Sequence, residues 1–389
     1  MELSSYPQPA LIHNDRLTSW EDIDSGGFGQ IFKAKHVEWG LDVAIKLLHS
    51  DNESSKSILR EAEMMKQGGH PHVLRILGIY EGQPPKRWSS SQLGLVMEFM
   101  ERGSLKSLLN KLEGPPPWPL VFRLAHQIAL GMNYLHCLSP PLLHLDLKPS
   151  NVLLDDSLSA KLTDFGLAKV VRSVSKAMGD DGWEEGGTLE YMPPEAFTES
   201  LGSYKPSCAS DVYSYGILLW SICTGKEPYS NVLSSMVRFH IPRGDRPSLT
   251  DRSLDCSKVV GLQGLKDLMG KCWHQDPKAR PSFRGCLEVT EVAYEQNKPG
   301  VSDAVHMVHK ILDSKRGSSG MEQNFEKLHI SPPQPQNGGI YINMSSVTGL
   351  QIGNDNYMSI TGRQRHPTAP PSVNASNKQP ETLKRTFNA

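Results

Sequence analysis

The most informative part of the sequence is His144-Leu-Asp146-Leu-Lys148-Pro-Ser-Asn151, which is followed by Asp164-Phe-Gly. A carboxylate can accept the proton of a hydroxyl group, and a lysine can neutralise a phosphoryl group during transfer. Amide and carboxylate oxygens are the ligands that Mg²⁺ prefers. The two segments therefore predict phosphoryl transfer, with Asp146 as proton acceptor, Lys148 as neutralising cation, and Asn151 and Asp164 as metal ligands.

A glycine-rich segment, Ser25-Gly-Gly-Phe-Gly29, lies upstream and is a weak signal on its own. Glycines let a backbone approach phosphates closely, so several nucleotide-binding folds use such segments, and ordinary turns use them too. Rossmann folds and P-loops continue into a helix, whereas Gln30-Ile-Phe-Lys-Ala-Lys35 alternates polar and apolar residues as a strand does. The pattern favours a β-hairpin over the phosphates, and its nucleotide-binding residues are Gly26, Gly27, Phe28 and Gly29.

A lysine and an acidic residue follow at the positions that such a site requires. Lys46 ends a second predicted strand, Leu41 to Leu48, and Glu61 lies within a predicted helix over residues 54–67. A carboxylate is needed to hold a lysine toward the α- and β-phosphates of a nucleotide. We expect Lys46 and Glu61 to form this pair, although Lys46 alone would be interpreted as a solvated charge at a strand end.

In this order the elements resemble the eukaryotic protein kinase domain over residues 16–295. The resemblance implies an α+β fold with a β-rich N-lobe, a helical C-lobe, and ATP and Mg²⁺ as cofactors. Tyr191-Met-Pro-Pro-Glu195 is similar to the end of the family's activation segment, which implies an ion pair between Glu195 and Arg280. A lysine two residues after the catalytic aspartate implies serine/threonine specificity.

The adenine site follows from the same resemblance. Leu95-Val-Met-Glu-Phe-Met100 is similar to the strand that enters the hinge between the lobes, with Met97 at the gatekeeper position. A purine needs an apolar slot and one polar backbone edge. The resemblance implies that backbone groups of Glu98 and Met100 bind adenine, and that three side chains sandwich its ring: Ile31, Ala44 and Leu153.

Composition changes near Lys298. The 389 residues carry a formal net charge of −1, which gives no electrostatic reason to expect nucleic acid or membrane partners. No apolar run reaches the roughly 18 residues of a membrane span. The six cysteines form no C-x-x-C pair, which favours a reducing compartment, the cytosol, with the nucleus as a second location. Beyond the kinase-like part we predict a linker over 296–337 with a short helix at 301–312, an assembly segment over 338–362, and a disordered tail over 363–389.

Residues 338–360 form a proline-free island in this tail, and Asp355 is their only charged residue. High strand propensity with amide and aromatic side chains favours a cross-β stack, and a disordered linker is the alternative. Within this island, four consecutive residues form a tetrad: Leu350, Gln351, Ile352 and Gly353. The tetrad is similar to the core of the receptor-interacting-protein homotypic interaction motif.

A kinase domain followed by this motif is similar to the receptor-interacting protein kinases. The resemblance implies amyloid-like homo-oligomerisation, trans-autophosphorylation and a role in necroptosis. It also implies partners with the same motif, such as receptor-interacting protein kinase 1, and a mixed-lineage kinase domain-like pseudokinase as substrate. Direct membrane insertion is not expected. Thr188 and Ser234 are candidate phosphorylation sites.

A signalling scaffold that does little chemistry is the competing interpretation. Asp24 stands where the family has its first loop glycine, and a carboxylate near a triphosphate is unfavourable. The complete set of Lys46, Asp146, Asn151 and Asp164 favours the enzyme, because a scaffold has no need of these residues.

Leu145 replaces an arginine that many kinases carry before the catalytic aspartate, so a phosphate within residues 167–190 has no cation there to bind. We expect Ser173→Ala, Ser175→Ala and Thr188→Ala each to retain ADP release close to wild type. A loss in the first two variants as large as in Asp146→Asn would contradict this expectation. Thr188 is the weaker test, because it lies near the expected substrate groove.

Overall fold

The computed structural model describes residues 10–26, 29–47, 69–85, 91–164, 189–198, 204–255, 257 and 259–327. They belong to the first of two units, Met1–Lys327. Several predicted positions lie outside the described residues: Gly27, Phe28, Glu61, Thr188, Leu350, Gln351, Ile352 and Gly353. The predicted assembly segment 338–362 and tail 363–389 lie outside them as well.

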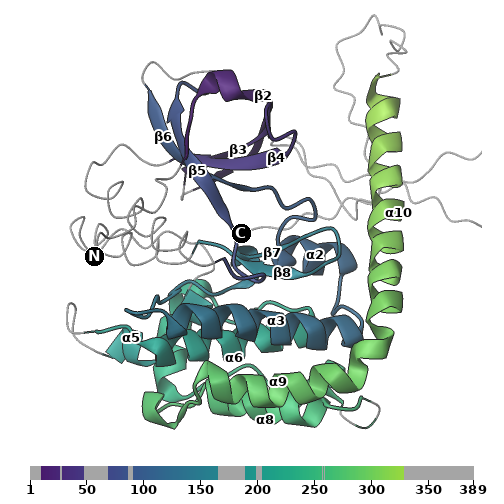
Figure 1. The fold of residues 1–389 in the computed structure, drawn as a ribbon. Helices are drawn as coiled ribbons and strands as arrows, with labels where there is room; N and C mark the ends of the chain where they lie inside the picture. Colours follow the sequence, from purple (N-terminus) through teal and green to yellow (C-terminus); the bar gives the residue numbers. More distant parts are fainter. Residues whose placement is uncertain are drawn as a thin grey trace, which may run out of the picture. The chain divides into compact units, whose positions relative to one another are not determined.

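The N-lobe is a six-stranded sheet in the order β1-β5-β6-β4-β3-β2 (Figure 1). Its strands are β1 (Ala10–Ile12), β2 (Leu17–Gly26), β3 (Gly29–His36), β4 (Asp42–Leu47), β5 (Ile76–Gly82) and β6 (Gln92–Glu98). β1 pairs with β5 in parallel, and the other neighbours are antiparallel. Alternating apolar residues such as Phe32 and Ala34 bury one face of the sheet. The predicted strands are confirmed, and β1 adds a strand before the predicted boundary at residue 16.

The strands on the two sides of the glycine-rich segment pair as a hairpin. Gly26 at the end of β2 pairs with Gly29 at the start of β3. β3 continues as a strand and pairs with β4, with Ile31 opposite Lys46. The strand that follows excludes a Rossmann or P-loop arrangement, as the alternation in Gln30–Lys35 predicted.

The C-lobe is helical. Its helices are α2 (Leu105–Leu112), α3 (Trp118–Cys137), α5 (Glu195–Thr198), α6 (Cys208–Thr224), α7 (Ser234–His240), α8 (Leu262–Cys272), α9 (Phe283–Asn297) and α10 (Val301–Lys327). A two-stranded sheet joins β7 (Val152–Leu154) to β8 (Ala160–Leu162). Short 3-10 helices cover Asn14–Arg16, Pro149–Asn151, Leu189–Tyr191, Ile241–Arg243, Arg252–Leu254, Pro277–Ala279 and Lys298–Gly300.

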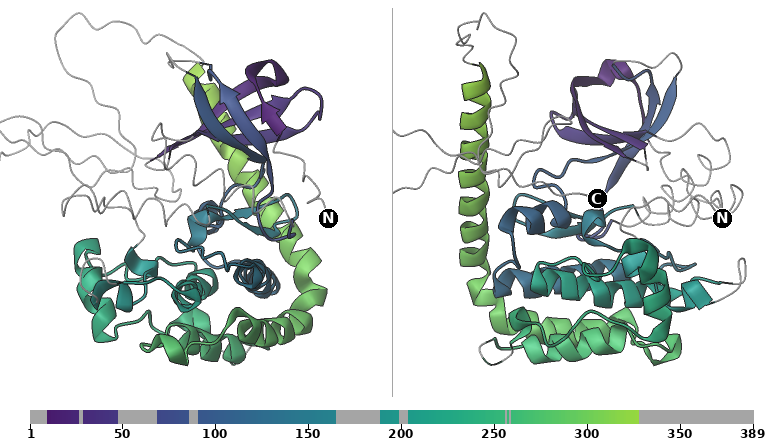
Figure 2. Two further views of the ribbon diagram at one scale, coloured as in Figure 1. Left: turned by 60° about the vertical axis from the view of Figure 1, so that its left-hand side comes forward. Right: turned by 180° about the vertical axis from the view of Figure 1, so that it is seen from behind.

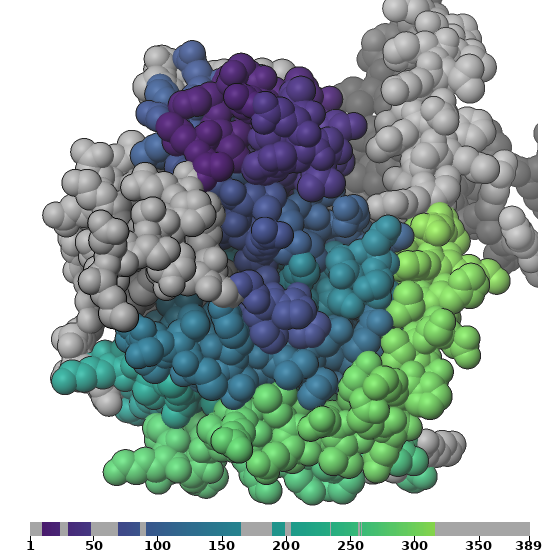
Figure 3. Space-filling model, in the orientation of Figure 1, coloured from purple at the N-terminus to yellow at the C-terminus, as the bar shows by residue number. Residues whose placement is uncertain are grey.

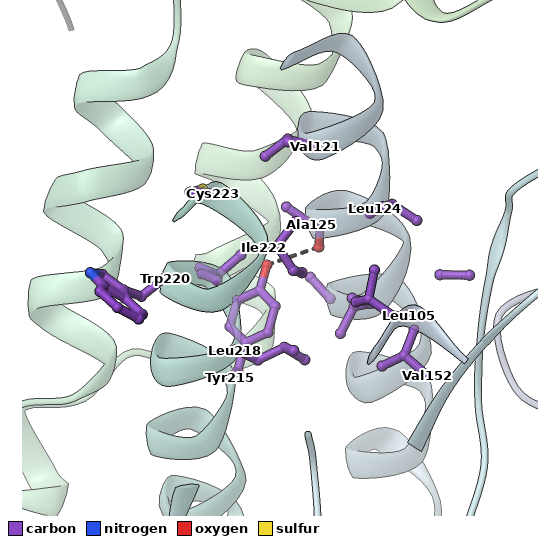
Figure 4. Close-up of a cluster of buried hydrophobic side chains, with 14 of the residues drawn as sticks. Leu105, Val121, Leu124, Ala125, Val152, Tyr215, Leu218, Trp220, Ile222 and Cys223 are labelled. Carbon is purple, nitrogen blue, oxygen red and sulfur yellow. Dashed lines mark hydrogen bonds between the residues drawn. The ribbon is translucent and has the colours of Figure 1, made fainter. Parts of the chain in front are cut away.

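Helices α3 and α6 form the centre of the C-lobe core. Figure 4 shows Tyr215 of α6 directed toward α3, where its hydroxyl donates to the backbone oxygen of Ala125 at 2.9 Å. On α6 the residues from Ser210 to Thr224 are all buried. A Cβ at Gly216 would lie 2.8 Å from the Cβ of Cys272, so only glycine allows α8 to approach α6 this closely. The predicted pair of Glu195 and Arg280 is confirmed, with both guanidinium-to-carboxylate distances at 2.8 Å.

The two lobes are connected by backbone hydrogen bonds as well as by the hinge. The N–H of Leu74 donates to the oxygen of Leu162 at 2.8 Å, and the N–H of Leu162 donates to the oxygen of His72 at 2.9 Å. The segment before β5 therefore pairs with β8 of the C-lobe. This pairing fixes β8, which leads directly to Asp164.

Helix α10 is longer than the predicted 301–312 helix and belongs to the same unit as the kinase-like part. Ala304, Val308 and Leu312 are buried at intervals of four residues, and α10 packs against α3 and α2 (Figure 2). In the space-filling view, α10 in yellow-green lies directly against the C-lobe (Figure 3). Composition after Lys298 is polar enough to suggest a linker, but this spaced apolar stripe is sufficient for packing. Among the described helices, none is long and apolar enough to cross a bilayer.

Leu312 tests whether α10 stabilises the folded unit. Leu312→Ala should lower the free energy of unfolding by about 2–3 kcal/mol, because it removes buried apolar contacts at 6% exposure. Met307→Ala, on the same helix at 51% exposure, is the matched control and should change it by less than about 0.5 kcal/mol. Urea unfolding of the full chain, followed by tryptophan fluorescence, measures both. Equal effects would show that α10 does not pack as described.

Candidate active site

Asp146 is positioned by a loop that Asp211 of α6 holds in place. The fully buried carboxylate of Asp211 accepts the N–H of Leu145 at Oδ1 (2.7 Å) and that of His144 at Oδ2 (2.9 Å). His136 Nε2 lies 2.8 Å from the same Oδ2. Leu145 has a φ of 61°, which is unfavourable for a residue with a side chain. These hydrogen bonds therefore fix the strained backbone immediately before Asp146.

His144 contributes its backbone rather than a titrating side chain. Burial lowers the pKa of its imidazole below the usual value, so the ring is neutral near pH 7. The sequence pattern did not single out His136 or Asp211 as functional. The signal that was available for Asp211 is an isolated acid at the start of a long apolar run in α6. Such an acid must find donors when the helix is buried.

The two carboxylate oxygens of Asp146 differ in their contacts with the described residues. Oδ2 accepts from Asn151 Nδ2 at 2.8 Å and lies 2.9 Å from Lys148 Nζ. Oδ1 is buried and has no hydrogen-bond partner among the described residues. The structure thus brings Asp146, Lys148 and Asn151 together, and Oδ1 is an acceptor that a further donor could use.

Asn151 and Asp164 provide oxygen atoms that suit a divalent cation. Asn151 Nδ2 donates to both the backbone oxygen and Oδ2 of Asp146, each at 2.8 Å, so its amide orientation presents Oδ1 as an acceptor. Thr163 N–H donates to the backbone oxygen of Asn151 at 3.1 Å, which places the neighbouring Asp164 beside it. No group of three or more His, Cys, Asp or Glu that could hold a metal occurs among the described residues. The amide and carboxylate oxygens of Asn151 and Asp164 are ligands that fit Mg²⁺, which also takes ligands from phosphate and water.

Lys46 forms an ion pair with Asp164. Its expected partner, Glu61, lies outside the described residues. Lys46 is 3% exposed on β4, and Asp164, two residues after the end of β8, has a φ of 59°. A buried lysine beside a candidate metal ligand is complementary to the charge of a metal-bound polyphosphate. The pair of Lys46 and Asp164 therefore suits the phosphate end of a nucleotide-binding site.

Apolar residues from both lobes form the predicted adenine slot. Ala44, Met97 and Met100 belong to one buried cluster, and Leu153 of β7 packs against it. Ala44 lies opposite Met97 in the pairing of β4 with β6. Ile31 is half-buried on β3 and is not part of the cluster. Four of the five predicted apolar residues are thus brought together.

Two backbone groups at the hinge form hydrogen bonds within the protein. Glu98 N–H donates to the oxygen of Arg75 at 3.2 Å, and the Met100 oxygen accepts from Gly103 N–H at 3.2 Å. The remaining backbone groups of these two residues, the carbonyl of Glu98 and the N–H of Met100, have the polarity that adenine needs, since its amino group donates and its ring nitrogen accepts.

The remaining predicted residues have more limited descriptions. Gly26 and Gly29 are described by their strand pairing only. Ser234 begins α7, and its side chain is outside the described part. Leu145 is buried at 7% exposure and lines a cavity of about 10 Å³ with Tyr191 and Met192. The position that holds arginine in many kinases is thus an apolar contact here.

Comparison with known proteins agrees with this geometry. Residues 17–289 match the family described as protein tyrosine and serine/threonine kinase. The chain is 41% identical over 311 residues to receptor-interacting serine/threonine-protein kinase 3 of Rattus norvegicus, which covers 79% of this chain and 63% of that protein. The human protein of the same name is 41% identical over 321 residues, 81% of this chain and 59% of that protein.

A third relative is more distant. Receptor-interacting serine/threonine-protein kinase 1 of Homo sapiens is 34% identical over 280 residues, 69% of this chain and 39% of that protein. The chain spans about three fifths of the length of the first two relatives, 63% and 59%. The expected resemblance to the receptor-interacting protein kinases is confirmed.

Proposed function

Because the chain belongs to the protein tyrosine and serine/threonine kinase family, we propose that it transfers the γ-phosphate of ATP to serine and threonine hydroxyls of proteins. The observation that carries this proposal is the Asp146 carboxylate. Asn151 and Lys148 hold its Oδ2, and its buried Oδ1 has no partner among the described residues. An acceptor fixed in this way suits a substrate hydroxyl group. Preference for serine and threonine is supported by Lys148, two residues after Asp146.

The residues of the chain act mainly by positioning and by neutralising charge. ATP supplies the phosphoryl group, and a divalent ion, which we take to be Mg²⁺, reduces the charge repulsion around it. Asp146 Oδ1 accepts the hydrogen bond of the substrate hydroxyl, orients its oxygen for in-line attack, and receives its proton. Lys148, 2.9 Å from Asp146 Oδ2, lies where negative charge develops on the transferred group. Asn151 and Asp164 would hold the ion, and Lys46 would contact the phosphates.

A scaffold with weak nucleotide binding remains the second candidate function, and Asp24 is the observation that favours it. Asp24 lies on β2 opposite Ile31, close to the hairpin turn. An acidic residue in place of the family's first loop glycine is electrostatically unfavourable for a triphosphate. Against it stands the assembled arrangement of Asp146, Lys148 and Asn151, which a scaffold does not require.

Asp146→Asn separates the two candidates. It removes the proton acceptor, so phosphate transfer to a protein substrate should fall at least about 100-fold, as expected for loss of a general base. Asp156→Asn is the matched control, because Asp156 is an exposed acid that pairs with Arg102 at 2.8 Å in the C-lobe. Radiolabel transfer by the full chain measures both variants. Equal transfer by wild type and Asp146→Asn would exclude the kinase proposal.

We further propose that the tail activates the kinase by assembly. The support comes from the sequence: a nearly uncharged island with high strand propensity and the tetrad Leu350 to Gly353. Stacking of this segment would concentrate the tethered kinase domains, to the millimolar range for short flexible linkers. Neighbouring domains would then phosphorylate each other.

The family resemblance extends this proposal to partners. Proteins with the same motif, such as receptor-interacting protein kinase 1, would nucleate the assembly. A mixed-lineage kinase domain-like pseudokinase would be the substrate, and necroptosis the process, in the cytosol with the nucleus as a second location. The similarity to receptor-interacting kinases 3 and 1 supports this assignment.

Three alanines in the tetrad test the assembly. The variant Gln351→Ala/Ile352→Ala/Gly353→Ala should form no thioflavin-positive fibres, because it loses the amide ladder and the apolar zipper. Asn374→Ala/Ser376→Ala/Asn377→Ala changes three polar residues of the same tail and should form fibres like wild type. Asp146→Asn should form fibres without transferring phosphate. The scaffold alternative is excluded if this fibre-forming variant fails to signal in cells, and assembly by the tetrad is excluded if the triple variant still forms fibres.

A further inference from the structure

The side chain of Glu98 contacts elements of both lobes. Its Oε1 accepts the backbone N–H of Arg75 at 2.8 Å, just before β5 of the N-lobe. Its Oε2 lies 2.6 Å from Lys161 Nζ on β8 of the C-lobe. Both side chains are only 20–26% exposed, so water screens this pair less than it screens a surface pair. One carboxylate therefore joins the hinge to the strand that leads to the phosphate end.

Both partners lie close in sequence to groups that would bind ATP. The backbone carbonyl of Glu98 is the acceptor proposed for adenine, and Lys161 precedes Asp164 by three residues. Between them, Thr163 N–H is bonded to the backbone oxygen of Asn151 at 3.1 Å. The pair between Glu98 and Lys161 thus links the adenine end of the site to the residues that would hold the divalent ion.

The other lysine at the hinge does not make such a link. Lys33 lies 4.7 Å from the centre of the Phe99 ring and pairs with Asp42 at 2.9 Å. Lys33 and Asp42 belong to β3 and β4, so this contact joins the hinge to the N-lobe alone. Among these charged contacts of the hinge, the pair with Lys161 is the one that reaches the C-lobe.

We propose that the ion pair between Glu98 and Lys161 is a positioning contact, which sets the adenine-binding edge of the hinge at the correct distance from Asp164. A ligand that contacts both ends, such as ATP with a divalent ion, needs this distance to be fixed in advance. Adenosine contacts only the adenine end and does not need it. The inference rests on the proposed binding of ATP, and it assigns to Glu98 a side-chain role in addition to its backbone role.

Lys161→Met tests the contact by comparing two ligands. The full chain should bind ATP with Mg²⁺ about fivefold more weakly, the size expected for one charge-assisted contact, while its affinity for adenosine stays within about twofold. Retained adenosine binding also shows that the variant is folded. Lys106→Met is the matched control, since Lys106 pairs with Glu227 at 2.7 Å at an exposed position within the C-lobe. This control should bind both ligands like wild type. Isothermal titration calorimetry measures each affinity.

A double-mutant cycle tests whether the two residues act as a pair. Glu98→Gln keeps an oxygen for the N–H of Arg75 and removes the charge that Lys161 faces. Glu98→Gln and Lys161→Met should each raise the KM for ATP and leave the KM for the protein substrate unchanged. The KM for ATP of the double variant should be no higher than that of the more impaired single variant. Additive losses would overturn the proposal. So would an equal loss of ATP and adenosine, which would indicate that the pair only stabilises the hinge.

The two proposals fail in different ways. If wild type binds ATP and the Lys161→Met variant binds it equally well, the positioning role is wrong and the kinase function is unaffected. If wild type binds no ATP, the proposed function and this inference are both overturned.

Discussion

The buried carboxylate of Asp211 is the constraint on which the active site depends. A charged group at 0% exposure is costly unless hydrogen bonds compensate for its lost hydration. Here the compensation comes from the backbone N–H groups of His144 and Leu145 and from the ring of His136. The requirement to satisfy this carboxylate and the requirement to place Asp146 are met by the same hydrogen bonds. The position of the proton acceptor is therefore set by α6, the most deeply buried helix of the C-lobe.

A series of direct contacts connects Asp146 to Asp164 and Lys46. The side-chain amide of Asn151 donates two hydrogen bonds to Asp146, and the backbone oxygen of Asn151 accepts the N–H of Thr163. Asp164 follows directly and pairs with Lys46 of β4. Because the residues of this series are in direct contact, a displacement of one residue would also displace the next. The pairing of Leu74 with Leu162 holds β8, which carries this path, against the N-lobe.

The sequence predicted those parts of the site whose members are close neighbours in the chain or carry a periodic pattern. Asp146, Lys148 and Asn151 share one loop, and the strands around Lys46 alternate clearly. The contact that Asp211 makes with the catalytic loop was missed, because Asp211 meets Leu145 across 66 residues and no local pattern predicts such a contact. The Glu98 side chain was missed for the same reason, since Lys161 is 63 residues away. Helix α10 was predicted too short, because its apolar stripe is sparse within a polar composition.

Leu145 shows how packing can take the place of a charge at this site. An arginine at 7% exposure would need an anion to compensate for its burial, whereas leucine needs only apolar neighbours. Tyr191 supplies one side of the contact. Its backbone oxygen accepts from Ser214 Oγ at 2.7 Å and its hydroxyl lies 3.2 Å from Ser221 Oγ, both on α6. The helix that fixes Asp146 through Asp211 therefore also fixes the segment around Tyr191. Both are held by buried contacts, so this part of the site belongs to the core of the C-lobe.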